Sequence, residues 1–185
     1  MKVVDIAKDI VHLSSKYGYP CNHTKIQKLL FLYVGFCLFN GTKAEEELSL
    51  IMDGKEIEMM AVVDEQPKAW PYGPVFVKVN NKYQEIETEG LAENYSLKVK
   101  DELSKLILAE TVKKYGRVES GQLSEWLQKE GSPWKAVQTI DGTGWDVEIP
   151  LDLMREYFDN NLENIIHDKR VVASHVVKKV VNDNI

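Results

Sequence analysis

Histidines are the side chains in this sequence best suited to metal binding or proton transfer, and they occur singly at His12, His23, His167 and His175. None of them lies in an H-x-x-x-H or H-E-x-x-H pattern. His167, Asp168 and His175 are near enough in sequence to be considered as metal ligands, but isolated surface histidines explain them more simply. The histidine spacing therefore predicts no metal site and no cofactor.

Two other groups of residues were candidates for chemistry. The loop Asp141-Gly-Thr-Gly144 has two glycines but lacks the further glycine and the Lys-Ser/Thr pair of a phosphate-binding loop. Asp64 and Glu65 are neighbouring carboxylates that could share an acid–base role. Carboxylates on a polar stretch are more commonly a solvated face, so we expect a protein that is not an enzyme.

The composition is that of a single globular domain with an acidic balance. The chain has 185 residues, 29 Asp and Glu against 23 Lys and Arg, and a net charge of −6. This charge argues against a general nucleic-acid or anionic-membrane binder and is compatible with a basic protein partner. The longest apolar run, 29–39, is far shorter than the ~20 residues that span a bilayer. Without a recognisable leader, the expected location is cytoplasmic.

The first elements that would position any site are two helices. Apolar residues recur at helical spacing over 3–17, and a second helix is expected over about 24–39, capped by Asn22 or Thr24 and ended by Gly41. The second helix is apolar nearly all round, which is typical of a helix at the centre of a core. Cys37 lies within it and is expected to be a small buried hydrophobe.

The segment 45–67 is strongly acidic. Within it, 48–59 resembles a hairpin whose turn is Asp53-Gly54, with a helix as the alternative. We regard this segment and the apolar positions of the C-terminal region as candidate partner-binding residues. They are Glu45, Glu46, Glu47, Glu56, Glu58, Asp64, Glu65, Val172 and Val176.

Further along the chain, helical patterns alternate with short loops. A helix is expected to begin at Gly73-Pro74 and to reach about residue 84, and a polar connection is expected over 85–95. The next expected helices are one over 97–115, capped by Ser96, and a shorter one that is capped by Ser120, contains Leu127 and closes at Gly131. The remaining expected elements are a turn of helix at Ser132-Pro-Trp134, a small strand at 147–149, a helix over 151–158, and a helix or arm after Asn160.

Large aromatic residues lie beside the turns. Burial in the core is the expectation for Trp70, Trp126 and Trp134, whereas Tyr72 and Trp145 remain candidates for anchors at a protein interface. The region 117–137 also admits a helix-turn-helix interpretation. Only Lys135 is basic after Trp134, however, so DNA reading is disfavoured.

Several motifs taken in order resemble one protein family. The chain contains Asp5-Ile-Ala7, then Lys25-Ile-Gln-Lys-Leu-Leu30, then Ala69-Trp-Pro-Tyr-Gly-Pro-Val75, and later Tyr115-Gly116 and Ser132-Pro-Trp134. This order resembles the Panacea domain of SocA-like antitoxins, also found in phage-associated GepA-type proteins. The resemblance covers residues 3–158. The residues that carry it most closely are Lys25, Gln27, Lys28, Leu29, Leu30, Ala69, Trp70, Tyr72, Gly73, Pro74, Val75 and Trp134.

The resemblance implies a scaffold and a class of partner. The motif residues themselves indicate how the scaffold is built, since Gly73 permits a tight turn and Trp70 with Tyr72 can wedge that turn against the central helix. The resemblance also implies an antitoxin that binds a cognate protein toxin, with delivery of that toxin to a AAA+ protease as the alternative. The expected fold is mainly α, a single compact multi-helix domain over 1–160 with about six or seven helices and a small β-hairpin, followed by a C-terminal extension over 161–185 that forms a helical arm.

Overall fold

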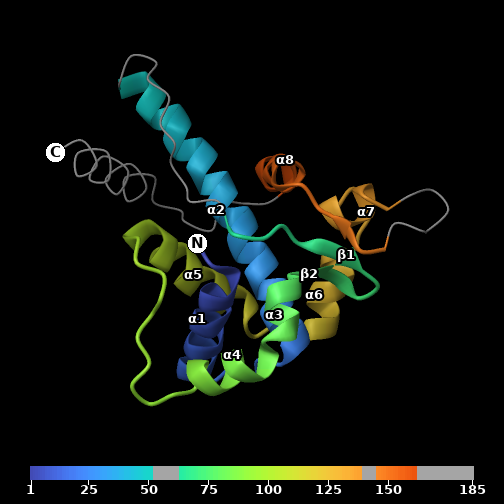
Figure 1. Cartoon of the computed structure of the whole chain (residues 1–185). Coiled ribbons are helices and arrows are strands. Elements are labelled where there is room, and N and C mark those ends of the chain that lie inside the picture. The colour runs from blue at the N-terminus through green and yellow to red at the C-terminus, as the bar shows by residue number, and fades with distance from the viewer. Residues whose placement is uncertain (52–62, 139–144, 162–185) are drawn as a thin grey trace.

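The described part of the protein is mainly α-helical, as expected. The computed structural model describes residues 1–51, 63–138 and 145–161, with the backbone alone for 40–51. These residues form eight helices and one three-stranded antiparallel sheet. The long helix α2 runs through the middle of the molecule, with α1 and α5 on one side and the sheet and α6 on the other (Figure 1).

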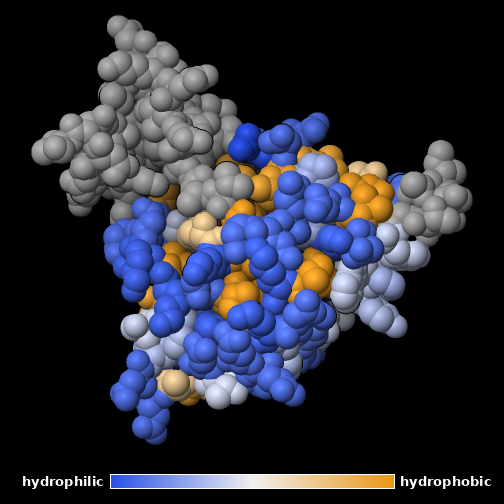
Figure 2. Space-filling model, viewed as in Figure 1, coloured by the Kyte–Doolittle hydropathy of each residue, from blue (hydrophilic) through white to orange (hydrophobic). Residues whose placement is uncertain are grey.

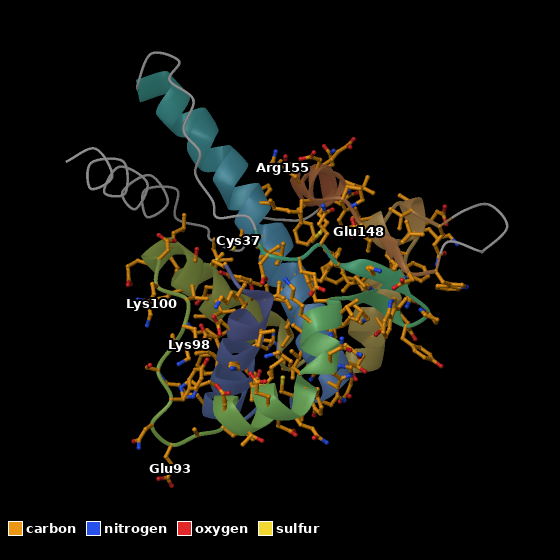
Figure 3. The ribbon with its side chains drawn as sticks, in the orientation of Figure 1. Cys37, Glu93, Lys98, Lys100, Glu148 and Arg155 are labelled. Atoms are coloured by element: carbon orange, nitrogen blue, oxygen red, sulfur yellow. The ribbon has the colours of Figure 1, made fainter. Side chains whose placement is uncertain are left out.

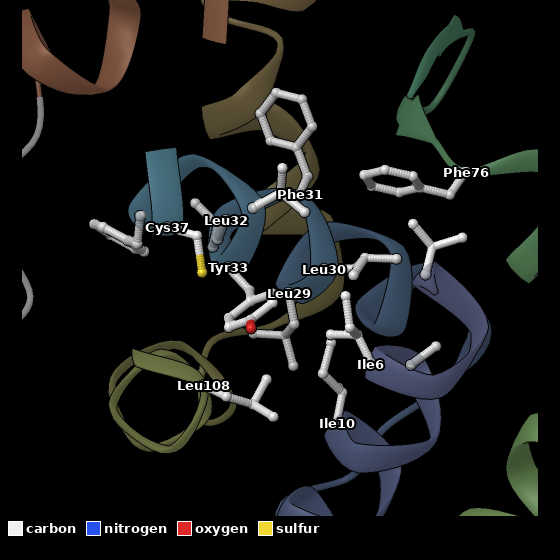
Figure 4. Close-up of a cluster of buried hydrophobic side chains, with 14 of the residues drawn as sticks. Ile6, Ile10, Leu29, Leu30, Phe31, Leu32, Tyr33, Cys37, Phe76 and Leu108 are labelled. Carbon is white, nitrogen blue, oxygen red and sulfur yellow. The ribbon is translucent and has the colours of Figure 1, made fainter. Parts of the chain in front are cut away.

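Helix α2 (His23–Ile51) is the centre of the core. Asn22 caps it, because the Lys25 N–H donates to Asn22 Oδ1 at 2.9 Å. Figure 4 shows Leu29 and Tyr33 between the α1 residues Ile6 and Ile10 and the α5 residue Leu108. The buried apolar residues of this helix are Ile26, Leu29, Leu30, Phe31, Leu32, Tyr33, Val34, Phe36, Cys37 and Phe39.

The expected helix end at Gly41 is wrong, because α2 continues to Ile51. One glycine costs a helix only about 1 kcal/mol, and the following Ala44-Glu-Glu-Glu-Leu48 consists of strong helix formers. The expected hairpin over 48–59 is also wrong in its first strand, because residues 48–51 are helical. Its remaining residues lie outside the described part.

Helices α1 (Val3–Lys16), α3 (Val77–Asn81) and α4 (Tyr83–Gly90) pack together beside α2. The expected helix start at Gly73-Pro74 is wrong, since the helix begins four residues later at Val77. The expected polar connection over 85–95 is helical as far as Gly90. Ile86 explains this, because its fully buried side chain gives α4 an apolar contact with the core.

Helix α5 (Glu102–Tyr115) begins later than its expected start at 97. Asp101, and not Ser96, caps it by accepting the Ser104 N–H at 2.8 Å. The Lys98 and Val99 N–H groups instead donate to the carboxylate of Asp9 in α1, at 2.8–3.0 Å. This contact between distant segments holds 98–99 in the loop before α5.

The C-terminal half of the described chain supplies three shorter helices. They are α6 (Ser120–Leu127), α7 (Pro133–Ala136) and α8 (Leu151–Asn161), all close to their expected positions. Ser132 caps α7, since its side chain accepts the Lys135 N–H. The expected cap of α6 at Ser120 is wrong, because Ser120 is the first residue of the helix and Glu119 is at the capping position. Helix α8 approaches α2 closely at Gly35, where an added Cβ would lie 2.1 Å from Cζ of Phe158.

The sheet has the strand order β2-β1-β3. Strand β1 (Lys68–Trp70) turns back into β2 (Gly73–Val75), and β3 (Val147–Glu148) pairs with the other side of β1. Gly73 adopts φ +102°, which a side chain would strain, and this allows the tight turn between β1 and β2. Pro74 is tolerated in β2 because this is an edge strand.

Candidate protein-binding site

The candidate site is built on a polar brace between α2 and the β1–β2 turn. Gln27, Lys28 and Lys25 are all almost fully buried on α2. Gln27 exchanges two hydrogen bonds with the backbone of Phe76: the Phe76 N–H donates to Oε1 at 2.8 Å, and Nε2 donates to the Phe76 carbonyl at 3.2 Å. The brace therefore fixes the chain just after β2.

Lys28 fixes the turn itself. Its Nζ donates to the Pro74 carbonyl at 3.2 Å and lies so near Gly73 that an added Cβ there would be 2.8 Å away. Burial lowers the pKa of the Lys28 ammonium to about 8. Lys25 acts in the same way at a different place, since its Nζ donates to the Gly116 carbonyl at 2.9 Å. These polar residues of the predicted motif hold backbone carbonyls.

A second set of contacts holds the outer side of the turn. The Trp134 indole N–H donates to the Trp70 carbonyl at 2.9 Å, and Gln128 Nε2 donates to the Pro71 carbonyl at 3.2 Å. Asp146, at φ +63°, accepts from the Trp70 indole and from Lys68 Nζ, both at 2.9 Å. The hydrogen bonds from Lys68 and Trp70 lower the pKa of this carboxyl group, so it stays ionised.

Part of the predicted scaffold gathers at the turn: Gln27, Lys28 and Trp134 bind its backbone. Lys25 instead binds the Gly116 carbonyl, and Leu29 packs between α1 and α5 (Figure 4). Leu29, Leu30 and Ala69 are fully buried, and Gly73, Pro74 and Val75 form a buried strand. Trp134 is buried as expected, whereas Trp70 is half-buried and Trp126 is half-buried against Tyr115, with ring centroids 5.8 Å apart.

Tyr72 does not wedge the turn against α2, contrary to the prediction. Its side chain is 81% exposed because it lies at the tip of the turn, where the backbone of Gly73 and Pro74 takes its place against Lys28. Trp145 is 45% exposed and Val147 40% exposed, on the segment that pairs with β1. We call Tyr72, Trp145 and Val147 the aromatic surface.

The aromatic surface lies on a rigid base. Among the described residues, Leu91 at the end of α4 is the other large apolar side chain of comparable exposure. Trp145 packs against the buried Trp134, with ring centroids 6.0 Å apart. Figure 2 shows a mainly hydrophilic surface in which orange apolar patches appear around the positions of α7 and α8; tyrosine and tryptophan are pale on this scale. Exposed Tyr and Trp side chains such as Tyr72 and Trp145 are frequent anchors of interaction sites.

The acidic candidates divide into two groups. Asp64 and Glu65 are bonded within the fold: the Val3 N–H donates to Asp64 Oδ1 at 2.9 Å, and the Lys78 N–H donates to both oxygens of Glu65 at 3.1 Å. They thus hold the first turns of α1 and α3. Glu45, Glu46 and Glu47 belong to α2, where only their backbone is described. The other four candidates, Glu56, Glu58, Val172 and Val176, lie outside the described residues.

The sequence reasoning missed Asp9, a fully buried carboxylate that also accepts the Tyr95 hydroxyl at 2.5 Å. A signal was present, since Asp9 adjoins Ile6 and Ile10 on the apolar face of α1. It also missed the hydrogen bond from Trp70 to Asp146, which no local pattern indicates because the two residues are 76 positions apart.

The described histidines take part in ring contacts. His12 lies against Tyr95 and His23 against Tyr83, with centroids 5.0 and 4.8 Å apart. Within residues 1–51, 63–138 and 145–161 no cluster of three metal-ligating side chains occurs. The candidate residues His167, Asp168, His175 and 141–144 lie outside these ranges.

No helix in the described part combines the length and the apolar character needed to cross a membrane. Comparison with known proteins found no matching family model, curated protein or solved structure.

Proposed function

We propose that this chain is an antitoxin that neutralises a cognate protein toxin by binding it directly. The observation that carries the proposal is the exposure of Tyr72 and Trp145 above a turn held from beneath by Lys28 and Trp134. Tyrosine and tryptophan are frequent interface anchors because they supply large contact areas with few rotatable bonds. The resemblance to Panacea antitoxins supplies the class of partner.

A fixed turn favours tight binding. Ordering a loop at an interface costs free energy that is subtracted from affinity. Here the carbonyls of Trp70, Pro71 and Pro74 already accept hydrogen bonds from the side chains of Trp134 on α7, Gln128 just after α6, and Lys28 on α2. A toxin binding this surface would therefore spend little free energy on ordering it.

The end of α2 is a second proposed contact. Its helical backbone continues beyond the body formed by α1 and α5 (Figure 1) and carries Glu45, Glu46 and Glu47. We propose that this acidic turn faces a basic part of the toxin. Reversing all three residues to lysine should then weaken neutralisation and reduce its salt dependence. Unchanged neutralisation by this triple variant would remove α2 from the interface.

Binding of the toxin is the direct test. The purified chain should bind the product of the neighbouring open reading frame with a Kd of about 1 nM or lower, about 12 kcal/mol, measured by titration calorimetry. Such an interface buries about 1,200–2,000 Å². A Kd weaker than micromolar for a toxic neighbour would contradict neutralisation by direct binding.

Delivery of the toxin to a AAA+ protease is the alternative mechanism. It shares the binding step, so affinity alone does not separate the two. Toxin lifetime does, since an adaptor shortens the half-life of the toxin in cells and a blocking antitoxin leaves it unchanged or lengthens it.

A DNA-binding role for 117–137 is less well supported. Helix α7 is a single turn of four residues, too short to serve as a recognition helix. Binding to the chain's own promoter that weakens steeply with salt would favour that role over the proposed one.

A further inference from the structure

Strand β3 has one open edge. It lies at the outside of the sheet and pairs with β1, where Glu148 stands opposite Lys68 and Val147 opposite Ala69. No described residue pairs with its other side. An open edge of this kind offers backbone donors and acceptors to another extended chain.

The register shows which backbone groups face outward. The Ile149 N–H donates to the Pro67 carbonyl at 2.8 Å, on the β1 side. In an antiparallel pair, alternate residues direct their N–H and C=O groups to opposite edges. Glu148 therefore directs its N–H and C=O away from β1, toward the open edge.

Exposed apolar groups flank the same edge. Val147 and Trp145 lie on the segment that carries it, and Tyr72 lies at the tip of the adjoining turn. Edge strands in natural proteins are usually protected by charges or prolines. Strand β3 has one such charge, Glu148, but the exposed side chains of Trp145 and Val147 leave apolar surface beside it for a partner.

The charge beside the edge is negative. Glu148 is exposed and forms no ion pair with a described residue, and the side chain of Asp152 is 93% exposed. Glu156 is exposed one turn further along α8. Arg155 is a cation on the same helix, with its Nη1 3.7 Å from Asp152 Oδ1. Figure 3 shows Glu148 and Arg155 on this side of the molecule. Lys68 is already paired with Asp146.

We propose that an extended, basic segment of the toxin adds to the sheet as a strand beside β3. Its backbone exchanges hydrogen bonds with Glu148, its apolar side chains cover Trp145 and Tyr72, and its Lys or Arg side chains pair with Glu148 and Asp152. This inference rests on the proposed function, because it specifies how the toxin is held.

The test separates backbone from side-chain recognition. Glu148→Pro removes the outward N–H, and Glu148→Gln removes the charge alone. We expect Glu148→Pro to raise the Kd for the toxin at least tenfold at every salt concentration. Glu148→Gln should raise it several-fold at low salt and little at high salt.

The aromatic contribution is tested with a matched control. The double variant Tyr72→Ala/Trp145→Ala should raise the Kd about 30-fold or more, as truncation of two anchors does. Leu91→Ala also removes an exposed apolar side chain and should leave the Kd unchanged. Urea unfolding of every variant verifies that the fold is retained.

Hydrogen exchange supplies a readout that needs no substitution. The Glu148 amide should exchange at least tenfold more slowly in the toxin complex than in the free chain, while the amide of Leu91 should be unaffected. This holds even if Glu148→Pro fails to fold.

The outcomes distinguish the two proposals. Wild-type affinity in Glu148→Pro together with an unprotected Glu148 amide overturns strand addition and leaves toxin binding standing. Strand addition is also overturned if the aromatic double variant loses affinity while Glu148→Pro retains it, because the toxin would then dock through side chains. If the wild-type chain does not bind the toxin, both proposals fall.

Discussion

Gln27 and Phe76 are joined by two hydrogen bonds, one in each direction, between a buried side-chain amide and one backbone unit 49 residues away. The pair closes the gap between the central helix and the chain that leaves the sheet. Because both partners are buried, removal of the Gln27 amide leaves the N–H and C=O of Phe76 without a hydrogen-bond partner, and water cannot reach them.

We therefore predict that Gln27→Leu lowers the free energy of unfolding by about 2–4 kcal/mol, measured by urea denaturation. Gln122→Leu is the matched control, since Gln122 is exposed on α6 and should change stability by less than about 0.5 kcal/mol. Equal stabilities of the two variants would show that the brace contributes nothing to the fold.

The burial of Lys28 predicts that the stability of the fold depends on pH. The pKa of Lys28 is lowered to about 8 from 10.5, so between these values the unfolded chain binds more protons than the folded chain. The free energy of unfolding should therefore rise with pH across this window, by at most about 3 kcal/mol, and should not depend on this group below about pH 8.

The measurement compares wild type with Lys28→Met between pH 7 and 10.5. The difference in free energy of unfolding between wild type and Lys28→Met should increase over that range. The difference between wild type and Lys129→Met, which removes an exposed lysine, should stay constant. A constant difference between wild type and Lys28→Met would show that Lys28 is not desolvated.

Two glycines should respond oppositely to alanine. Gly35→Ala drives a methyl group into the ring of Phe158 and should cost about 1–3 kcal/mol or more. Gly121→Ala, on α6, meets no atom within 4 Å and should stabilise the chain by up to about 1 kcal/mol. Thermal unfolding measures both.

A double variant identifies the cause of the Gly35 effect. Phe158→Leu shortens the facing side chain, so Gly35→Ala should cost less in that background than in the wild type. Purely additive effects would contradict the close contact between α2 and α8.

Much of the fold follows from local sequence. Apolar spacing predicts α1, α6 and α8, because each of these helices buries one face, and a continuous apolar run predicts the central part of α2, which is buried on all sides. Capping predicts the start of α2 at Asn22, whereas the residue that resembled a cap of α6, Ser120, is the first residue of that helix. What local sequence predicts poorly is the exact point at which an element ends.

Some of those ends depend on distant contacts and others on competing local preferences. Gly41 and Pro74 resemble a helix stop and a helix start, but the strong helix formers after Gly41 and the edge position of Pro74 decide otherwise. Likewise α5 begins at Glu102 because Asp9, in a different helix, binds the amides of 98–99. For Tyr72 the sequence admits both a wedge against α2 and an exposed interface anchor, and the position of its side chain at the tip of the turn decides between them.

The role of Asp9 leads to a local prediction. Asp9→Ala leaves the Lys98 and Val99 amides without acceptors, so their hydrogen exchange should accelerate at least tenfold, and stability should fall by about 2–4 kcal/mol. Asp5→Ala, also on α1, serves as the control and should leave both amides protected. Unchanged exchange in Asp9→Ala would contradict this anchoring.

The central claim is toxin neutralisation, and growth tests it most directly. Cells would express the product of the neighbouring open reading frame alone, with this chain, and with Tyr72→Ala/Trp145→Ala. The account predicts that the neighbour stops growth, that the wild-type chain restores it, and that the double variant restores it less. A neighbour that is harmless, or toxic but not rescued by the wild-type chain, would contradict the account.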